Sequence, residues 1–239
     1  LGGALGAGAS GFDRLRHGPL RHQVLGLLAL HADGSFVKSG GRVGKNVTGY
    51  DLHRLWCGSQ GTLCFLLEAT LRLYPAPAEV AMLRTRCAQR GEALAKSHAL
   101  LRTALAPLAV VLRTNADEAP LELDVVLAGR AEAVASEIEA LQPLLGASEL
   151  LRGAEAQRVR AELVAAEHEG GTWAPLVLSC RPSRLPGALE RLERAARELE
   201  LAPRLLCHPL LAQADVRFAG AQPARAQRAA LTRALADAE

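Results

Sequence analysis

The stretch from Gly40 to Pro75 constrains this chain most, because it places clustered glycines directly before a strand pattern with strict alternation. From Thr62 to Tyr74 the odd positions are apolar and most polar residues fall on the even positions, which is the period of a half-buried strand. The glycines before this strand let the backbone approach a ligand closely or adopt positive φ. The pattern predicts loops built around a ligand and a strand with these side chains inward: Leu63, Phe65, Leu67, Ala69, Leu71 and Leu73.

Further motifs extend this pattern over about the first third of the chain. They are Gly2-Gly3-Ala4-Leu5-Gly6, the run from Arg16 to Gly26, Lys45-Asn46-Val47-Thr48-Gly49-Tyr50-Asp51-Leu52, Gly58-Ser59-Gln60-Gly61-Thr62-Leu63 and Glu68-Ala69-Thr70-Leu71-Arg72-Leu73. In this order and spacing the chain resembles the FAD-binding domain of the vanillyl-alcohol oxidase/PCMH flavoprotein superfamily. Within that superfamily, it is most similar to the FAD-binding subunits of glycolate oxidases.

The resemblance implies a bound FAD and assigns its contacts by matching positions. Backbone amides at glycine clusters favour the anionic pyrophosphate, and Lys45 would add a point charge. Cys64 departs from the pattern, because the family usually has a second glycine there. The sequence shows no nucleophile and base at catalytic spacing and no paired carboxylates, so no catalytic residue is assigned. The cofactor-binding positions are Gly2, Gly3, Gly6, Gly11, Val24, Lys45, Gly61, Phe65 and Leu66.

By resemblance, the reaction would be oxidation of a small 2-hydroxy acid such as glycolate, with FAD passing the electrons to an acceptor. Complexes of this family also contain a larger flavoprotein subunit and an iron-sulfur subunit, so both are expected partners. The alternative is a noncatalytic assembly or electron-relay subunit that docks to a catalytic flavoprotein partner. The sequence leaves the two functions open.

The segment Pro75-Ala76-Pro77 predicts a domain boundary, since each proline fixes φ and removes a backbone donor. Residues 1–76 would form the C-terminal part of a PCMH-type FAD-binding domain, and residues 77–239 an α+β cap domain. Beyond the boundary, the expected order of strand, helix, strand, strand and helix suggests a ferredoxin-like fold. The resemblance further implies a fragment that lacks the preceding FAD subdomain and is truncated at its C-terminus.

Periodicity predicts the individual elements of the α+β fold. A hairpin is expected from 24–31 and 36–39, with Asp33-Gly34 in its turn, and a short helix over 50–57. Helices are predicted over 92–106, 131–145, 154–168 and 185–201, and strands over 81–87, 108–114, 121–128, 176–180 and near Leu205.

Composition argues against several other classes of function. A net charge of +3 and 3% aromatic residues give no basic stripe with interleaved aromatics, so nucleic-acid binding is not expected. The five cysteines form no CxxC pair, which fits a reducing compartment. His168 and His208 have no partners at metal-ligand spacing, so no metal site is expected. No run of about 18 apolar residues predicts a transmembrane helix. We expect a bacterial protein that is cytoplasmic or held at the inner membrane by partner subunits.

A second glycine motif matches the pattern of a different cofactor-binding fold. The segment Gly6-Ala7-Gly8-Ala9-Ser10-Gly11 matches GxGxxG, and Asp33 follows at a distance suited to a ribose contact. A Rossmann unit needs a strand before these glycines and a helix opening from them, whereas Gly18 and Pro19 interrupt the segment that follows. The motif context therefore disfavours a Rossmann fold.

Overall fold

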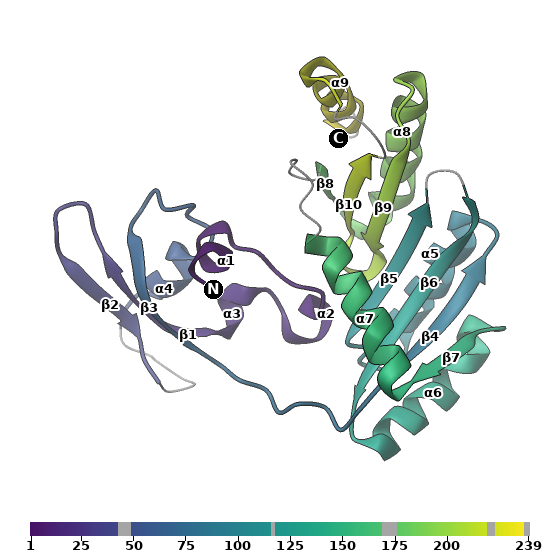
Figure 1. Ribbon diagram of the computed structural model, residues 1–239, viewed down its shortest axis with the longest axis horizontal. Coiled ribbons are helices and arrows are strands. Elements are labelled where there is room, and N and C mark those ends of the chain that lie inside the picture. The colour runs from purple at the N-terminus through teal and green to yellow at the C-terminus, as the bar shows by residue number, and fades with distance from the viewer. Residues whose placement is uncertain (43–48, 116–117, 169–175, 219–222, 237–239) are drawn as a thin grey trace. The chain divides into compact units, whose positions relative to one another are not determined.

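The structure is a computed structural model of the 239-residue chain, and it describes residues 1–42, 49–115, 118–168, 176–218 and 223–236. The chain divides into two compact units, Leu1–Ala76 and Pro77–Glu239. Both units combine helices with an antiparallel sheet, so the predicted α+β class is confirmed (Figure 1).

Unit 1 is built on a three-stranded antiparallel sheet in the order β2-β1-β3. The predicted hairpin is confirmed: β1 (Val24–Leu30) pairs with β2 (Phe36–Gly40), and the Asp33 carboxylate closes the turn by accepting hydrogen bonds from Ser35 N and Oγ at 2.9 and 2.6 Å. The predicted short helix is α4 (Leu52–Trp56). The remaining elements are α1 (Gly2–Ala7), α2 (Arg14–His17), α3 (Leu20–Gln23) and β3 (Phe65–Leu71).

The core of unit 1 lies between the sheet and these short helices. It consists of Leu5, Val24, Leu27, Ala29, Trp56 and Cys64, with Leu20, Val37, Leu52, Cys57, Leu66 and Leu71 packed against it.

The predicted inward face of the strand after the glycine loops is wrong for most of its length. The pairing of β3 with β1 shifts register, because Glu68 lies opposite Leu28 while Leu66 lies opposite the next residue, Ala29. One extra residue in a strand reverses which side chains face the core. Leu66 consequently packs on the core, whereas Phe65 and Leu67 are 68% and 43% exposed, and Leu63 and Leu73 are also exposed.

Unit 2 is built on a seven-stranded antiparallel sheet in the order β7-β4-β6-β5-β9-β10-β8. Its strands are β4 (Glu79–Cys87), β5 (Ala109–Asn115), β6 (Glu118–Gly129), β7 (Glu149–Arg152), β8 (Leu176–Ser179), β9 (Pro203–His208) and β10 (Gln213–Phe218). Its helices are α5 (Arg90–Ala99), which continues as the 3₁₀ turn Leu100–Arg102, α6 (Ala131–Leu145), α7 (Gly153–His168), α8 (Leu185–Glu198) and α9 (Arg225–Ala236), with further 3₁₀ turns at Pro182–Arg184 and Pro209–Leu211.

Unit 2 contains one motif twice. The segment β4-α5-β5-β6-α6-β7, in the spatial order β7-β4-β6-β5, is a ferredoxin-like fold as predicted. The segment β8-α8-β9-β10 repeats its first four elements, in the matching order β8-β10-β9. The repeats meet where β5 pairs with β9, and Leu112 lies opposite Cys207.

Strand pairing defines which residues of the two repeats are equivalent. We align Cys87, the last residue of β4, with Cys180, the residue directly after β8, so Thr85 corresponds to Leu178 and Arg84 to Val177. Thr85 pairs with Leu123 and Leu123 with Leu112, while Leu178 pairs with Ala214 and Ala214 with Cys207. Leu112 and Cys207 are therefore equivalent, and a local two-fold axis passes through the pair that they form.

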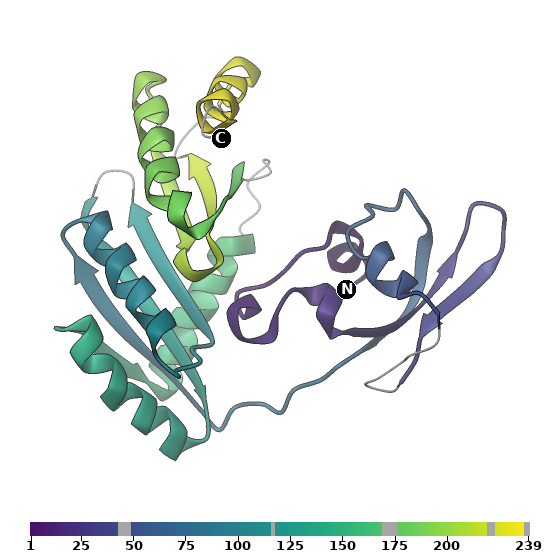
Figure 2. The ribbon, with the colours of Figure 1, turned by 180° about the vertical axis from the view of Figure 1, so that it is seen from behind.

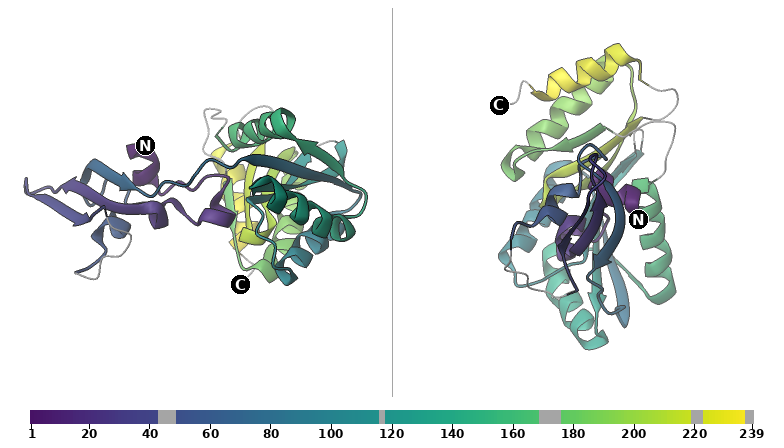
Figure 3. Two further views of the ribbon diagram at one scale, coloured as in Figure 1. Left: turned by 90° about the horizontal axis from the view of Figure 1, so that it is seen from below. Right: turned by 90° about the vertical axis from the view of Figure 1, so that its left-hand side faces the viewer.

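The two faces of this sheet differ in chemistry. One face is apolar and is covered by α5, α6 and α8, as the view from behind shows (Figure 2). On the other face, α7 packs against β4 and β7 and buries Ala156, Val159 and Leu163, so that unit 2 is layered helix, sheet, helix in this region (Figure 3). Beyond α7, this second face carries charged residues.

Candidate functional site

Two segments of unit 1 meet backbone to backbone at glycines. Gly8, the residue directly after α1, has φ +65°, and a Cβ added there would lie 3.0 Å from Gly58 Cα. Gly58 N donates to Leu5 O at 2.9 Å, and Gln60 N donates to Gly6 O at 2.8 Å. These bonds fix the loop after α4 against the end of α1, and the contact leaves no room for a side chain on Gly8.

All five glycines predicted to bind the cofactor lie where unit 1 is open, and we call these positions the open edge. A Cβ added at any of them meets no atom within 4 Å, which applies to Gly2, Gly3, Gly6, Gly11 and Gly61. Their backbone can therefore be approached closely from outside.

The other predicted cofactor residues fall into different surroundings. Phe65 is exposed at the start of β3, beyond the loop that contains Gly61. Val24 is buried and Leu66 packs on the core of unit 1, so neither lies on the open edge. Lys45 lies outside the described residues.

Cys64 turns its side chain into the core of unit 1 rather than onto the open edge. It is buried with Leu5 and Trp56 in the same cluster, and burial raises the pKa of its thiol. The departure from the family's glycine pattern therefore places no side chain on the edge that Gly61 and Phe65 form.

A buried polar pair, which the sequence motifs did not single out, joins α4 to β2. Ser39 Oγ accepts a hydrogen bond from His53 N at 3.1 Å and lies 3.1 Å from His53 Nδ1. His53 is buried, and burial lowers the pKa of its imidazole. The pair fixes α4 against β2. Ser39 and His53 match no motif spacing, so periodicity alone could not find them.

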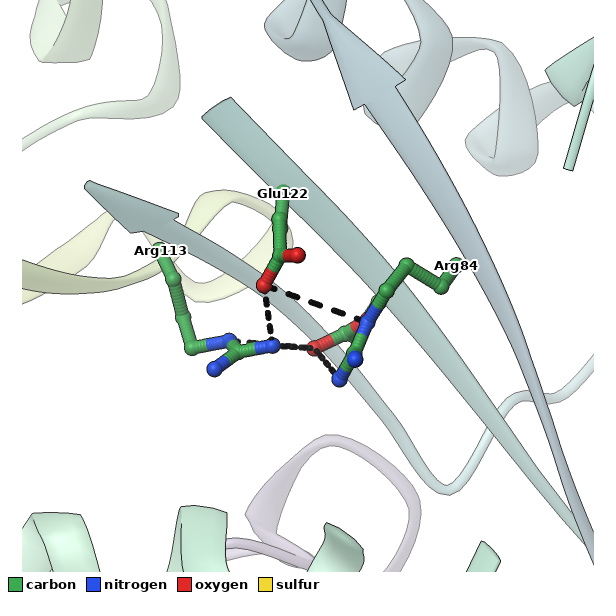
Figure 4. Close-up of polar contacts among 4 residues, drawn as sticks. Arg84, Arg113 and Glu122 are labelled. Carbon is green, nitrogen blue, oxygen red and sulfur yellow. Dashed lines mark hydrogen bonds and ion pairs between the residues drawn. The ribbon is translucent and has the colours of Figure 1, made fainter. Parts of the chain in front are cut away.

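The charged face of unit 2 is organised around one fully buried carboxylate (Figure 4). Asp124 on β6 accepts hydrogen bonds from Arg84 Nε and Nη2 at 2.8 and 3.3 Å, and from Arg113 Nε at 3.2 Å. Glu122 accepts a further bond from Arg113 and lies 3.9 Å from Arg84 Nε. Burial would lower the pKa of Arg84, but the hydrogen bond to Asp124 and the nearby carboxylates outweigh it and raise the pKa. We call these four residues the Asp124 network.

The register extends this polar face across the two-fold axis. Glu122 lies opposite Arg113, Arg113 opposite Leu206, and Leu206 opposite Asp215. Directly opposite residues in an antiparallel pair share a face. By the same equivalence, three positions of the network recur in the second repeat: Arg113 corresponds to His208, Glu122 to Gln213 and Asp124 to Asp215. Single polar residues within apolar strands were the only sequence signal for this face.

Among the described residues, no three His, Cys, Asp or Glu side chains are grouped so that they could hold a metal ion. In the part of the chain that the structure covers, no helix is both long and apolar enough to cross a membrane.

The chain resembles flavin-linked enzymes in sequence. No family model matches it. An uncharacterised FAD-linked oxidoreductase of Mycobacterium tuberculosis is 36% identical over 107 residues, which cover 45% of this chain and 23% of the relative. The glycolate oxidase subunit GlcD of Bacillus subtilis is 40% identical over 77 residues, covering 32% of this chain and 16% of the relative. A D-2-hydroxyglutarate dehydrogenase of Xanthomonas citri is 33% identical over 165 residues, covering 67% and 32%.

The fold has solved counterparts. Alkyldihydroxyacetonephosphate synthase matches the whole chain with a TM-score of 0.69 and 12% identity, and this chain spans 52% of it. The sequence matches reach less than a third of the length of the relatives named above. The predicted flavoprotein resemblance is confirmed at this level: the chain has the α+β fold of one half of that synthase, and its sequence relatives are FAD-linked oxidoreductases and hydroxy-acid dehydrogenases.

Proposed function

We propose that this chain is the FAD-binding part and cap of an oxidoreductase that oxidises a 2-hydroxy acid. The observation that carries the proposal is the chemistry shared by its relatives' names. They are named for glycolate, D-lactate and D-2-hydroxyglutarate, which are all carboxylates with a hydroxyl group on the adjacent carbon. A common ancestor with that chemistry explains the similarity to several enzymes with different substrates.

Unit 1 supplies the FAD contacts in this proposal, as the second half of a PCMH-type domain. The open glycines fit a group that needs close backbone approach, and exposed Phe65 offers an apolar surface for a ring system. When bound, FAD supplies the hydride acceptor. The chain's own residues contribute binding and orientation: Gly61, at φ +75°, shapes the loop, and the Ser39–His53 pair fixes α4 against β2. Lys45 stays a predicted contact of the cofactor.

Unit 2 is the cap, and its charged face offers cations for a carboxylate substrate. The guanidinium groups of Arg84 and Arg113 are held in fixed positions by Asp124. Expected partners are a larger flavoprotein subunit and an iron-sulfur subunit, in the cytoplasm or at the inner membrane. Both assignments rest on the resemblance to glycolate oxidase subunits.

A noncatalytic docking or electron-relay subunit is the second candidate, and the surface of unit 1 favours it. Its described residues expose several large apolar side chains, including Phe36, Tyr50, Leu55, Phe65 and Leu73. Exposed apolar side chains that join into one patch mark an interaction surface, which is what this second candidate requires.

The visible spectrum of the full-length protein, purified in the dark, tests the proposal first. Flavin bands at near one FAD per chain, bleached by glycolate, D-lactate or D-2-hydroxyglutarate without any partner, would support an oxidoreductase with its own substrate site. Flavin that none of these acids reduces, but that a partner flavoprotein does, would support the relay. A colourless protein that does not take up added FAD would contradict both.

A further inference from the structure

We infer that the outer face of the sheet in unit 1 is an interface between two copies of this chain. The inference goes beyond the proposed function and does not rest on it, because it uses only the register, exposure and charges of this sheet. Two rows of residues across β2, β1 and β3 define the outer face: Phe36, Leu30 and Phe65 in the first row, and Lys38, Leu28 and Glu68 in the second.

The strand register brings both rows onto one face. Leu30 lies opposite Phe36 on β2 and opposite Phe65 on β3, and directly opposite residues in an antiparallel pair share a face. Leu28 is two residues before Leu30 on the central strand β1, so the second row lies on the same side of the sheet as the first.

The core of unit 1 lies on the opposite side of this sheet. Leu27 and Ala29 of β1 are buried there with Trp56 of α4. On the outer face, Phe36 and Phe65 are by contrast 69% and 68% exposed. Two exposed aromatic rings in one row with a leucine between them form an apolar strip, which is the kind of surface that a protein partner covers.

The second row carries opposite charges at its two ends. Lys38 and Glu68 are both exposed, and among the residues that the structure describes neither takes part in an ion pair. They lie two strand spacings apart, about 10 Å, which is too far for a direct contact between them within one chain. The outer face therefore has a positive edge on β2 and a negative edge on β3.

A second copy matches this pattern when the two-fold axis lies between the sheets and parallel to β1. With that axis, β2 of one copy lies over β3 of the other in a face-to-face packing of sheets. Lys38 then meets Glu68 of the second copy, and this contact occurs twice in the dimer. In the first row, Phe36 meets Phe65 of the second copy and Leu30 meets its own counterpart. An interface of this symmetry must be self-complementary, and both rows of the outer face are.

The dimer assigns Phe65 to the interface in place of a contact with FAD. The glycines of α1 are not part of the outer face, because α1 packs on the core side of the sheet through Leu5. The outer face is only three strands wide, at about 4.8 Å a strand, which is small for a stable interface. We therefore expect a weak dimer, with a Kd of about 10–100 µM.

Charge reversal tests the proposed symmetry. Lys38→Glu puts two carboxylates at each contact and Glu68→Lys two ammonium groups, so each variant alone should dimerise at least about tenfold more weakly than the parent. Sedimentation equilibrium of the full-length protein, from about 1 to about 500 µM, measures the Kd. Arg54→Glu is the matched control, because it reverses an exposed charge on α4, which packs on the core side of the sheet, and its Kd should stay within about twofold of the parent's.

Mixing the two variants distinguishes a second copy from any other occupant of the outer face. An equimolar mixture of Lys38→Glu and Glu68→Lys pairs opposite charges at both contacts, and so does the double variant Lys38→Glu/Glu68→Lys with itself. Both should recover the parent's Kd within about threefold, which would also show that the single variants are folded.

A parent protein that stays monomeric at about 500 µM would overturn the inference. So would single variants that dimerise like the parent, or a mixture that stays as monomeric as its components. Molecular mass is read without flavin, so a dimer that takes up no FAD would reject the proposed function and leave this interface standing, and a flavin-loaded monomer would do the reverse.

Discussion

Replacing Asp124 by asparagine removes the central charge of the charged sheet face while keeping the side chain's shape. The Asp124 side chain has no exposed surface, and it accepts hydrogen bonds at 2.8, 3.3 and 3.2 Å from two arginines. Leaving a buried charge uncompensated costs about 3–5 kcal/mol. Arg84 and Arg113 retain 15% and 30% of their side-chain exposure, and Glu122 stays close to both. We therefore expect Asp124→Asn to lower the free energy of unfolding of unit 2 by about 3 kcal/mol, at the low end of that range.

Hydrogen exchange measured by mass spectrometry on peptides from β4 and β6 reports this loss, since their slowest amides exchange through cooperative opening. A loss of about 3 kcal/mol raises the exchange rate of those amides about a hundredfold. The control is Asp51→Asn, because Asp51 pairs with Arg54 on an exposed surface of unit 1 and such pairs contribute less than about 1 kcal/mol. The double replacement Arg84→Met/Asp124→Leu should recover most of the loss. An Asp124→Asn variant that exchanges like the parent would refute the reasoning.

Three further predictions test other parts of the chain. Because burial lowers the pKa of His53 below its usual 6.5, the folded state prefers the neutral ring. Unit 1 should therefore keep its full stability above about pH 6.5 and lose the contribution of His53 as the pH falls further. Thermal unfolding should show a smaller loss at low pH in His53→Gln, but not in His22→Gln, because His22 is exposed. In urea unfolding, Gly40→Ala should destabilise unit 1 by at least about 2 kcal/mol more than Gly34→Ala. Both glycines have positive φ, but only at Gly40 would the new Cβ meet a backbone oxygen, Leu25 O, at 2.2 Å. Equal losses of stability would contradict the steric clash at Gly40. Burial raises the pKa of Cys207 to about 12, so iodoacetamide at pH 8 should label it only after unfolding, and labelling of the native protein would show that β9 opens.

The sequence was informative where local chemistry decides the structure. Helices with several apolar residues at helical spacing, such as α6 with Val134, Ile138 and Leu141, were predicted almost to the residue. The helix expected to reach Ala106 ends earlier, because Thr103 is extended and its hydroxyl donates to Leu100 O. β7 was not predicted, because its four residues, Glu149-Leu150-Leu151-Arg152, show no alternation of apolar and polar side chains.

Long-range pairing decided what the sequence could not show. The alternation around Phe65 was real, but which face was inward depended on a register shift against β1, a strand far away in sequence. For the same reason, the Asp124 network was invisible: Arg84 and Asp124 are 40 positions apart and meet only because β4 pairs with β6. Cofactor binding at the open glycines stays a prediction.

The junction between β5 and β9 is a narrow seam in an otherwise broad sheet. The pairing that joins the two repeats runs from Leu112 to Thr114 on one side and from Leu205 to Cys207 on the other. Each repeat has its own local strand pairs and helices, so each can form early from contacts that are near in sequence. The relative position of the two repeats is thus set by the backbone hydrogen bonds of this seam, and a single proline there would remove one of them.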